Sequence, residues 1–387
     1  MIHYQKDADN IATLTLDMQA QSVNVINHRA VESLRPVLEH LRSEAAQRRL
    51  TGVIITSAKR SFSAGGDLDY LHNAESAEQI FAYSRTLNEI LRGIELLPVP
   101  VVAAINGAAL GSGYELALAC HYRIALDTPN TLIGLPEVSL GMIPGGGSLV
   151  RLAWSLGIEA AFELTSRGKQ YHVQEALRKG LIDKVVTERR ELLEEAREYI
   201  RSRPDIVKLW DKGIEPPRLC NPRHPYTAQL IADLNAQVYA RTRGNYPAQQ
   251  AIVNALYECM QVSFEQALNI VSRHFTRVIL DRTCRNMTKA FWYDYNRIRN
   301  GAPRPKGYGR FRARRIGVIG AGDMGAGIAF LAATEGIEVV IKDISLAIAQ
   351  QGKNMCFRLV EDLVSSDKLS RAQGNEILAR IHPTDKA

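Results

Sequence analysis

The pattern of apolar and polar residues along the first half of the chain predicts strands that alternate with helices. Strand-like runs such as IATLTLD (11–17), GVIITS (52–57) and VPVVAAING (99–107) are short and apolar. Between them, RAVESLRPVLEHLRSEAAQ (29–47) carries apolar residues at helical spacing. This alternation of strands with helices is typical of an α/β domain.

From about residue 190 the pattern becomes helical. The segment SFEQALNIVSRHFTRVIL (263–280) opens with Ser263 and Gln266 at the spacing of a capping box and continues with a helical apolar face. A basic Pro/Gly-rich stretch then leads to a strand, a glycine-rich turn and a helix. We therefore divide the chain into an α/β core (1–190), a helical extension (191–300), a linker (301–313) and a final unit (314–387).

Composition excludes several classes of protein. The 387 residues are 46% hydrophobic and 23% charged, as in ordinary globular proteins, and no apolar stretch is long enough to span a bilayer. The sequence MIHYQKDADNIATLTLD at the N-terminus lacks the pattern of a signal peptide. The five cysteines are scattered without a CxxC pair, and the histidines show no metal-ligand spacing. We expect a cytoplasmic protein with reduced thiols and no metal site.

The formal charge of +7 suits an anionic ligand. Much of the excess lies in GAPRPKGYGRFRARR (301–315), where the sequence favours a solvated linker over an interaction patch. The aromatics there, Tyr308 and Phe311, are too few to indicate RNA binding, so no nucleic-acid partner is expected. The cationic residues of this stretch are Arg304, Lys306, Arg310, Arg312, Arg314 and Arg315.

Two glycine-containing loops follow predicted strands. SFSAGGDLDYL (61–71) follows the strand at 52–57, and INGAALGSGYELALAC (105–120) follows the strand at 99–107. Glycine at a strand end permits a tight turn and leaves backbone N–H groups free to face a ligand. Two such N–H groups that converge would form an oxyanion hole, although each loop alone is also typical of an ordinary turn. Because Leu110 replaces the first glycine of a G-x-S-x-G motif, Ser112 is a poor candidate nucleophile.

Two glutamates occur in apolar surroundings. Glu115 follows the second glycine loop, and Glu137 lies in IGLPEVSLGMIPGGGSLVRL (133–152). A carboxylate is costly to bury unpaired, so such groups either hold hydrogen bonds and water or have raised pKa values. Salt bridges to Arg123 or Arg151 are an equally weighted alternative.

Taken together, SVNVINHRAV, SFSAGGDLDYL, INGAALGSGYELALACHYRIA and IGLPEVSLGMIPGGGSLVRL resemble the enoyl-CoA hydratase/isomerase (crotonase) superfamily in order and approximate spacing. The resemblance covers residues 1–190 and implies a crotonase-like ββα spiral core with a helical C-terminal extension. By position, the two oxyanion-hole amides of the family fall on Gly66 and Ser112. Its two hydratase glutamates fall on Glu115 and Glu137.

The resemblance implies syn addition of water to a 2-trans-enoyl-CoA, with a coenzyme A thioester as substrate. Glu115 would deprotonate the water, and Glu137 would protonate the α-carbon. Two alternatives stay open. An enoyl-CoA isomerase could need only Glu137. A non-catalytic acyl-CoA-binding module would result if Ser112 disables the oxyanion hole, because the family usually has glycine at this position. Lys59 and Arg60, beside the first glycine loop, are candidate contacts for the phosphates of coenzyme A.

The final unit, RRIGVIGAGDMGAGIAFLAATEGIEVVIKDIS (314–345), contains a strand, three glycines in G-x-G-x-x-G spacing, a helix, a second strand and an acid. The glycines permit close approach of a pyrophosphate to the helix N-terminus, and the acid would bind the ribose hydroxyls. This partial Rossmann βαβ unit resembles the start of an NAD-dependent 3-hydroxyacyl-CoA dehydrogenase. The candidate NAD-binding residues are Gly320, Gly322, Gly325 and Asp343.

This combination resembles the multifunctional α-subunits of fatty-acid oxidation complexes, and implies a piece of a longer protein. The catalytic histidine and glutamate of the dehydrogenase have no counterpart here, so we expect no dehydrogenase activity in this chain and NAD binding only in the full-length parent. The stretches 245–260 and 283–300 resemble the linking helices of such subunits, which pair with a thiolase β-subunit. A homo-oligomer is the alternative. In the other interpretation, the helical extension completes the hydratase domain and covers the mouth of its acyl pocket.

Overall fold

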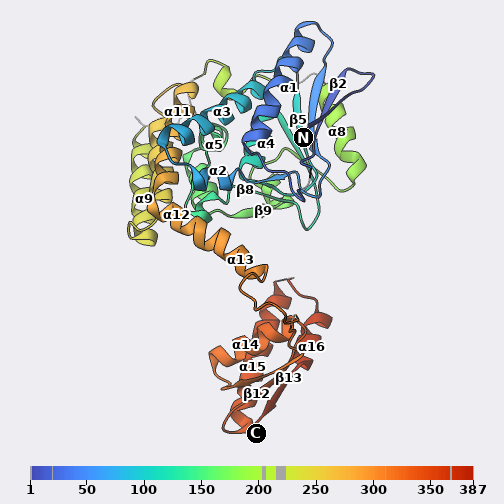
Figure 1. Cartoon of the computed structure of the whole chain (residues 1–387), viewed down its shortest axis with the longest axis vertical. Coiled ribbons are helices and arrows are strands. Elements are labelled where there is room, and N and C mark those ends of the chain that lie inside the picture. The colour runs from blue at the N-terminus through green and yellow to red at the C-terminus, as the bar shows by residue number, and fades with distance from the viewer. Residues whose placement is uncertain are drawn as a thin grey trace. The chain divides into compact units, whose positions relative to one another are not determined.

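The structure is a computed structural model that describes residues 2–19, 21–202, 206–214, 224–309, 311–366 and 368–386. Arg310 of the basic stretch and one of the five cysteines, Cys220, lie outside the described residues. The chain forms two compact units, Met1–Pro303 and Arg304–Ala387 (Figure 1).

The first unit contains two sheets. The larger sheet has the strand order β1-β2-β3-β5-β7-β10, in which all pairs are parallel except β1 with β2. Its strands are β1 (Ile2–Lys6), β2 (Ile11–Leu16), β3 (Gly52–Ser57), β5 (Val101–Ile105), β7 (Tyr122–Leu126) and β10 (Lys184–Val186). The smaller sheet has the order β4-β6-β8-β9. Its strands are β4 (Ser63–Ala64), β6 (Ala109–Leu110), β8 (Leu132–Gly134) and β9 (Gln170–His172).

The chain passes back and forth between these sheets in a repeated pattern, and each repeat forms one turn of a spiral. A strand of the larger sheet is followed by a strand of the smaller sheet and then by a helix. The first such turn is β3, β4 and α2 (Leu68–Asn73), the second is β5, β6 and α4 (Ser112–Ala119), and the third is β7, β8 and the 3₁₀ helix η1 (Glu137–Leu140). This is the ββα spiral that the resemblance implies.

The expected elements are confirmed. The strands at 11–17, 52–57 and 99–107 correspond to β2, β3 and β5, and the helix at 29–47 is α1 (His28–Ala46). Helix α11 (Phe264–Leu280) begins with the predicted capping box, because the side chains of Ser263 and Gln266 each accept a hydrogen bond from the other residue's backbone N–H.

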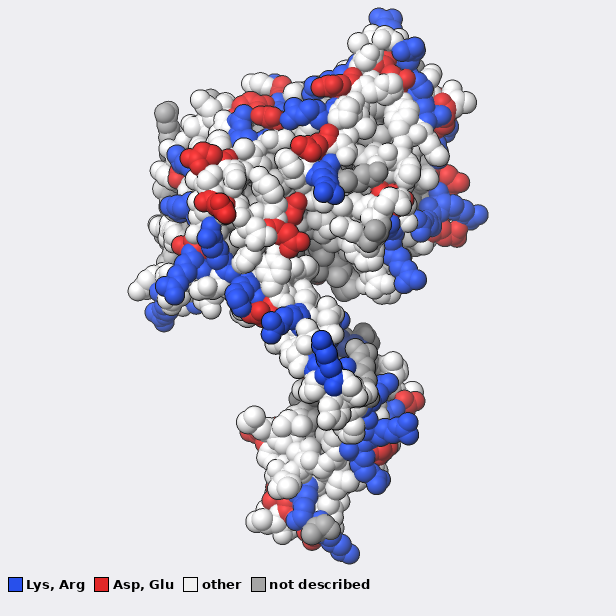
Figure 2. Space-filling view, in the orientation of Figure 1, with Lys and Arg blue, Asp and Glu red and all other residues white. Residues whose placement is uncertain are grey.

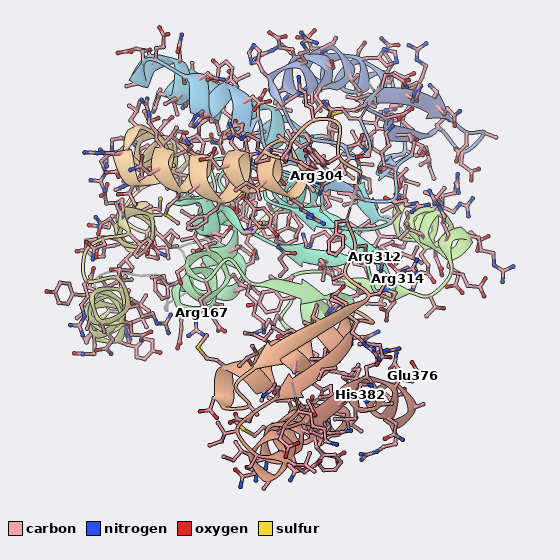
Figure 3. All side chains as sticks on the ribbon, turned by 60° about the horizontal axis from the view of Figure 1, so that its bottom comes forward. Arg167, Arg304, Arg312, Arg314, Glu376 and His382 are labelled. Atoms are coloured by element: carbon pink, nitrogen blue, oxygen red, sulfur yellow. The ribbon has the colours of Figure 1, made fainter. Side chains whose placement is uncertain are left out.

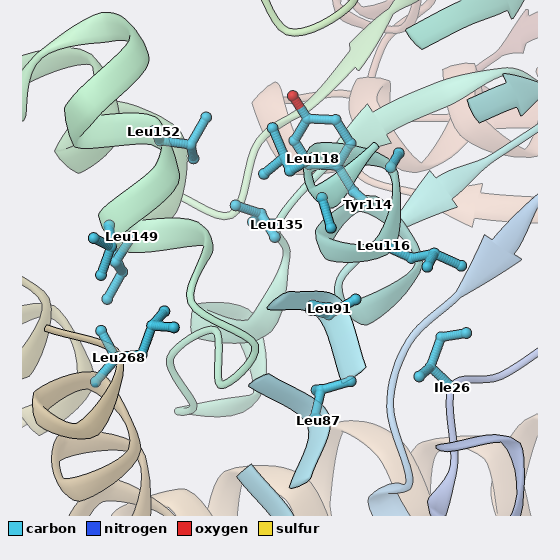
Figure 4. Packing of buried hydrophobic residues seen from close by; sticks show 14 of the residues in the cluster. Ile26, Leu87, Leu91, Tyr114, Leu116, Leu118, Leu135, Leu149, Leu152 and Leu268 are labelled. Atoms are coloured by element: carbon cyan, nitrogen blue, oxygen red, sulfur yellow. The ribbon is translucent and has the colours of Figure 1, made fainter. Parts of the chain in front are cut away.

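The apolar core lies on both faces of the larger sheet. On one face, Ile54, Val102 and Ile124 pack against α8 (Arg189–Arg201). On the other face lies a larger cluster that contains α4, whose residues from Gly113 to Ala119 are all buried. Figure 4 shows Tyr114, Leu116 and Leu118 of α4 within this cluster. A helix buried on every side is a rigid support for a functional group.

Further helices surround this core (Figure 1). Helix α11 packs against α3, α10, α5 and α12. A π-helical turn, η4, continues α12 directly into α13. The helices are α3 (Ala77–Glu95), α5 (Ser148–Leu156), α6 (Ile158–Ser166), α7 (Val173–Arg178), α9 (Pro225–Thr242), α10 (Pro247–Cys259), α12 (Arg282–Thr288), η4 (Lys289–Asp294) and α13 (Tyr295–Arg299).

The second unit is a partial Rossmann fold with a parallel sheet in the order β11-β12-β13. Its apolar cluster includes Val318, Ala329, Val339 and Ile341. Its elements are β11 (Arg315–Ile319), α14 (Asp323–Thr334), β12 (Glu338–Lys342), α15 (Leu346–Ser365), α16 (Arg371–Ala379) and β13 (Ile381–Thr384).

Charged residues are mostly interspersed. On the face of the first unit that Figure 2 shows, Lys and Arg alternate with Asp and Glu, without a single broad basic field. Arg304, Arg312 and Arg314 of the basic stretch are exposed, and Figure 3 labels them. Among the described residues, no helix is both long and apolar enough to cross a membrane.

Candidate active site

Three parallel strands of the smaller sheet end side by side. Ala64 of β4 is paired with Leu110 of β6, which is paired with Gly134 of β8. Just beyond these strand ends the chain reaches Gly66, Ser112 and Glu137, respectively. Because the strands run in the same direction and in register, the residues that follow them meet at one edge of the sheet. The topology therefore brings together three of the four residues that the sequence selected.

These three residues line a pocket of about 940 Å³. Side chains from other elements complete its wall, among them Tyr83 and Leu87 of α3. The wall is mainly apolar with a few polar groups, which is the character of a small-molecule site.

Gly66 and Ser112 each offer a backbone N–H at the pocket wall. Ser112 is the first residue of α4, where an N–H has no acceptor within the helix. Within the described part of the chain, neither N–H donates a hydrogen bond to a backbone carbonyl. The two residues are close neighbours, because a Cβ placed on Gly66 would lie 3.2 Å from Ser112 Oγ. Two free donors at adjacent positions fit an oxyanion hole.

Gly111 explains why a small residue precedes Ser112. Its φ of +57° lies in the left-handed region, which favours glycine. A Cβ at this position would also lie 2.9 Å from Glu137 Oε1. The glycine therefore permits both the turn into α4 and the close approach of the Glu137 carboxyl group.

Glu115 is fully buried on α4, and its carboxylate accepts hydrogen bonds from the segment 146–148, where α5 begins. The N–H of Gly146 lies 2.8 Å from Oε1 and 2.9 Å from Oε2. Ser148 donates to Oε1 from its hydroxyl at 2.8 Å and from its N–H at 3.2 Å. Burial raises the pKa of Glu115, while these donors and the charge of Arg151 oppose that rise. Glu115 is absent from the described pocket lining, but Gly145, next to Gly146, belongs to it.

Glu137 lies in a different environment. Its side chain lines the pocket, and its Oε2 is buried without a hydrogen-bond partner in the part of the chain that the structure describes. Burial, and then the negative charge of Glu115, raise the pKa of Glu137 to about 8. A carboxyl group whose pKa is raised in this way keeps its proton to higher pH, which is the property that a general acid needs.

The alternative of salt bridges from these glutamates to Arg123 or Arg151 is wrong. Arg123 forms its ion pair with Asp183 at 2.8 Å. Arg151 forms a buried ion pair with Glu95, with its Nε 2.6 Å from Oε1. The Nη1 of Arg151 also donates to the carbonyl oxygen of Gly146 at 2.6 Å, so Arg151 supports the loop that holds Glu115.

Sequence reasoning missed two residues of this site. Ser148 holds Glu115, and Tyr83 lines the pocket and donates from its hydroxyl to the Ile26 carbonyl oxygen at 3.1 Å. The position of Ser148 after a Pro-Gly-Gly-Gly turn was a usable signal, because hydroxyl and N–H donors gather at helix starts. Lys59 and Arg60 are absent from the described pocket lining, and Lys59 pairs with Asp17 at 2.7 Å.

The glycine-rich turn of the second unit has the geometry of a dinucleotide site. Gly320 has a φ of +93°, and nothing lies within 4 Å of the position where its Cβ would stand. A Cβ on Gly325 would collide with the carbonyl oxygen of Gly320, so only glycine fits there. Gly322 precedes α14, which puts free N–H groups beside the turn. These features fit the pyrophosphate of NAD.

Asp343 follows β12 and is bound to the same turn. Its Oδ2 accepts a hydrogen bond from the N–H of Ala321 at 2.6 Å, and its Oδ1 accepts one from the N–H of Ile344 at 2.7 Å. These two bonds hold the pKa of the Asp343 carboxyl below its usual value. The ionised carboxylate retains acceptor capacity for ribose hydroxyls.

Comparisons with known proteins match one family model to residues of each unit. The family model "Enoyl-CoA hydratase/isomerase" matches residues 6–207, and the model "3-hydroxyacyl-CoA dehydrogenase, NAD binding domain" matches residues 315–387. The fatty acid oxidation complex subunit alpha of Shewanella amazonensis is 30% identical over 391 residues, which cover 97% of this chain and 52% of that protein. The chain thus spans about half the length of this curated relative.

Solved structures share the fold of the first unit. The human mitochondrial delta3-delta2-enoyl-CoA isomerase matches with a TM-score of 0.53 and 22% identity over 77% of this chain and 98% of that chain. The enoyl-CoA hydratase from Bacillus halodurans matches with a TM-score of 0.51 and 21% identity over 75% of this chain and 99% of that chain. With the family model covering more than half of its length, the chain belongs to the enoyl-CoA hydratase/isomerase family.

Proposed function

We propose that the first unit is an enoyl-CoA hydratase, which adds water syn to a 2-trans-enoyl-CoA to give a 3-hydroxyacyl-CoA in fatty-acid β-oxidation. The observation that carries this proposal is the pair of buried carboxylates with opposite surroundings, Glu115 and Glu137, beside the two free N–H groups of Gly66 and Ser112. Family membership supports the same activity.

The oxyanion hole acts on the thioester. As water attacks the β-carbon, the electrons of the double bond move towards the carbonyl oxygen and give an enolate-like transition state. The N–H groups of Gly66 and Ser112 would donate to that oxygen, and each such donor stabilises the transition state by about 3 kcal/mol in comparable sites. The N–H of Ser112 is a backbone group, so the serine side chain does not remove it.

The two glutamates divide the proton transfers. Glu115 accepts hydrogen bonds from Gly146 and Ser148 and is the better stabilised anion, so it would take a proton from the attacking water. Glu137, with its raised pKa, would deliver its proton to the α-carbon. One C–O bond and one C–H bond form while the C=C π bond breaks, so the product is the neutral addition product of water.

The test is the loss of conjugated enoyl-thioester absorbance on mixing the protein with 2-trans-enoyl-CoA. We expect Glu115→Gln and Glu137→Gln to lower kcat by about a hundredfold or more, because each removes a general acid or base. Glu89→Gln, at a half-exposed glutamate of α3, is the matched control and should keep full activity. Binding of acyl-CoA without turnover by the parent chain would replace this proposal with that of an acyl-CoA-binding module.

Isomerisation of enoyl-CoA is the second candidate. It is favoured by one observation, that Glu137 lines the described pocket whereas Glu115 lies behind it. A single carboxylate can move a proton between the two carbons of a double-bond shift. With a 3-enoyl-CoA, an isomerase would produce conjugated absorbance, and the Glu115→Gln variant would retain that activity.

For the longer protein we propose 3-hydroxyacyl-CoA dehydrogenase activity as well. Gly320, Gly322, Gly325 and Asp343 would hold NAD, which supplies the hydride acceptor for oxidation of the 3-hydroxyl group. We expect this chain by itself to lack that activity. We also propose that the protein works as a subunit of a complex, which the name of its Shewanella relative, a subunit of a fatty acid oxidation complex, supports. A thiolase β-subunit in the cytoplasm is the proposed partner, with a homo-oligomer as the alternative.

A further inference from the structure

We propose that Phe291 and Trp292 determine substrate specificity, by contacting the acyl chain and selecting enoyl-CoA molecules with medium and long chains. Both residues belong to the π-helical turn η4 and line the pocket that contains Glu137. The kinetic part of this inference rests on the proposed hydratase function, and the binding part does not.

The two side chains present uncovered apolar surface to the pocket. Phe291 is 60% exposed and Trp292 is 45% exposed, although both are large aromatic residues. Covering such surface with an alkyl chain removes it from water and stabilises the complex in proportion to the area buried. A ligand that reaches η4 therefore gains affinity that a shorter ligand does not.

The turn that carries these residues is fixed to α2 on one side of the pocket. The hydroxyl of Tyr293 donates to Asp69 Oδ1 at 2.7 Å, and the Tyr293 ring lies 4.8 Å from the His72 ring, measured between centroids. π-helical turns within α-helices occur frequently at functional sites. Here the turn places Phe291 and Trp292 at the pocket, while Tyr293 anchors the turn to α2.

The preceding helix, α12, is fixed to the segment that carries Glu137. Thr288 donates from its hydroxyl to the carbonyl oxygen of Leu140 at 3.3 Å. Gly141 packs so closely on α12 that a Cβ there would lie 2.9 Å from Met287 Sδ. The aromatic pair and the acid therefore belong to one connected wall, and their relative positions are set by direct contacts.

The character of the pocket wall gives the direction of the acyl chain. The elements that contact α12 and η4 contribute the leucines Leu68, Leu71 and Leu140 to the pocket, together with Asp69, whose carboxylate accepts the hydrogen bond from Tyr293. Elsewhere the lining includes the polar side chains of Gln21 and Gln170. An alkyl chain suits the first region, and the amide-containing arm of coenzyme A suits the second. No Lys or Arg occurs in the described lining, so this region is unsuited to the phosphates.

The kinetic test compares 2-trans-enoyl-CoA substrates with four, ten and sixteen carbons. We expect Phe291→Ala and Trp292→Ala to lower kcat/KM about tenfold for the two longer substrates and less than about twofold for the four-carbon substrate. Phe291→Leu should recover most of the loss. Tyr295→Ala is the matched control, because Tyr295 is 57% exposed on the adjoining helix and is absent from the described lining. Equal losses at all three lengths would overturn the proposal.

A binding test is independent of turnover. Saturated decanoyl-CoA should change the fluorescence of Trp292, whereas butyryl-CoA should not, and the change should vanish in Trp292→Phe. If the protein binds decanoyl-CoA in this way but hydrates no substrate, the hydratase proposal fails and the specificity proposal stands. If both thioesters give the same change, or neither does, the specificity proposal fails whatever the hydratase assay shows.

Discussion

Ser148 donates two hydrogen bonds to the Glu115 carboxylate, one from its hydroxyl at 2.8 Å and one from its backbone N–H at 3.2 Å. Both bonds are fully buried, where hydrogen bonds to a charged group have their largest effect. We therefore expect Ser148 to be a positioning residue, which holds Glu115, the proposed base.

Replacing Ser148 by alanine removes the hydroxyl bond and leaves the backbone bond. Since that hydroxyl lowers the pKa of Glu115, its loss should raise the pKa and move the acidic limb of the pH–rate profile to higher pH. We expect kcat/KM at neutral pH to fall about tenfold and Ser148→Thr to recover activity. A fall without a shift of the acidic limb would mean that Ser148 has only a structural role. Ser155→Ala, at an exposed serine of the same helix, is the control.

The raised pKa of Glu137 predicts that both activity and stability fall as the pH rises, over different pH ranges. The proposed hydration requires protonated Glu137, so kcat should fall as the pH rises through about 8. The folded-state pKa is above the unfolded-state value, so the folded state binds this proton more tightly. The stability contribution is therefore greatest at low pH and is lost as the pH rises from the unfolded pKa to about 8.

The variant Glu137→Gln separates these effects. It removes the ionisation, so it should raise Tm relative to the parent chain at pH 8 by more than it does at pH 5. The measurement is thermal unfolding at both pH values, with Glu89→Gln as the control. An equal difference in Tm at the two pH values would show that burial does not disfavour the ionised form of Glu137.

The buried ion pair between Glu95 and Arg151 should be costly to break. Among the described residues, Arg151→Met leaves the buried Glu95 carboxylate with one cation at ion-pair distance, Arg92, whose Nη1 lies 3.1 Å from Oε2. We expect a loss of about 3–5 kcal/mol in the free energy of unfolding by urea. The exposed pair of Arg85 with Glu89 is the comparison, and Arg85→Met there should cost less than about 1 kcal/mol. Similar costs at both sites would contradict this expectation.

Gly111→Ala tests the contact between the glycine turn and Glu137. The added Cβ would combine an unfavourable positive φ with a 2.9 Å approach to Glu137 Oε1. The matched control is Gly157→Ala, which has a φ of +90° and nothing within 4 Å of its Cβ position. Both should lose about 1 kcal/mol or more of stability. Only Gly111→Ala should also lose about tenfold or more in kcat, so equal activity in the two variants would contradict the assigned contact.

The sequence shows that Gly66, Ser112 and Glu137 follow short strands, and the family resemblance singles them out. In the structure the regular return of strands in the ββα repeat brings those strand ends together. The surroundings of Glu115 depend instead on a long-range contact: the helix start at Ser148 signals hydrogen-bond donors, but it does not identify Glu115, 33 residues away, as their partner.

Sequence reasoning did not select the aromatic residues of the pocket wall. Phe291 and Trp292 lie far along the chain from Glu137, in a segment that the sequence predicts to be helical and that resembles a linking helix. Their place at the pocket depends on long-range contacts of Thr288 and Tyr293. Helical periodicity identifies a buried face, but it does not say which cavity an exposed aromatic residue borders.

The spiral has a consequence for how new chemistry can arise on this fold. The proposed donors and acids are spread over three turns, with Gly66 on the first, Ser112 and Glu115 on the second, and Glu137 on the third. Neighbouring turns are joined by two pairs of residues in the smaller sheet. An insertion or exchange within the third turn can therefore move Glu137 while the adjacent strands keep Gly66 and Ser112 in register.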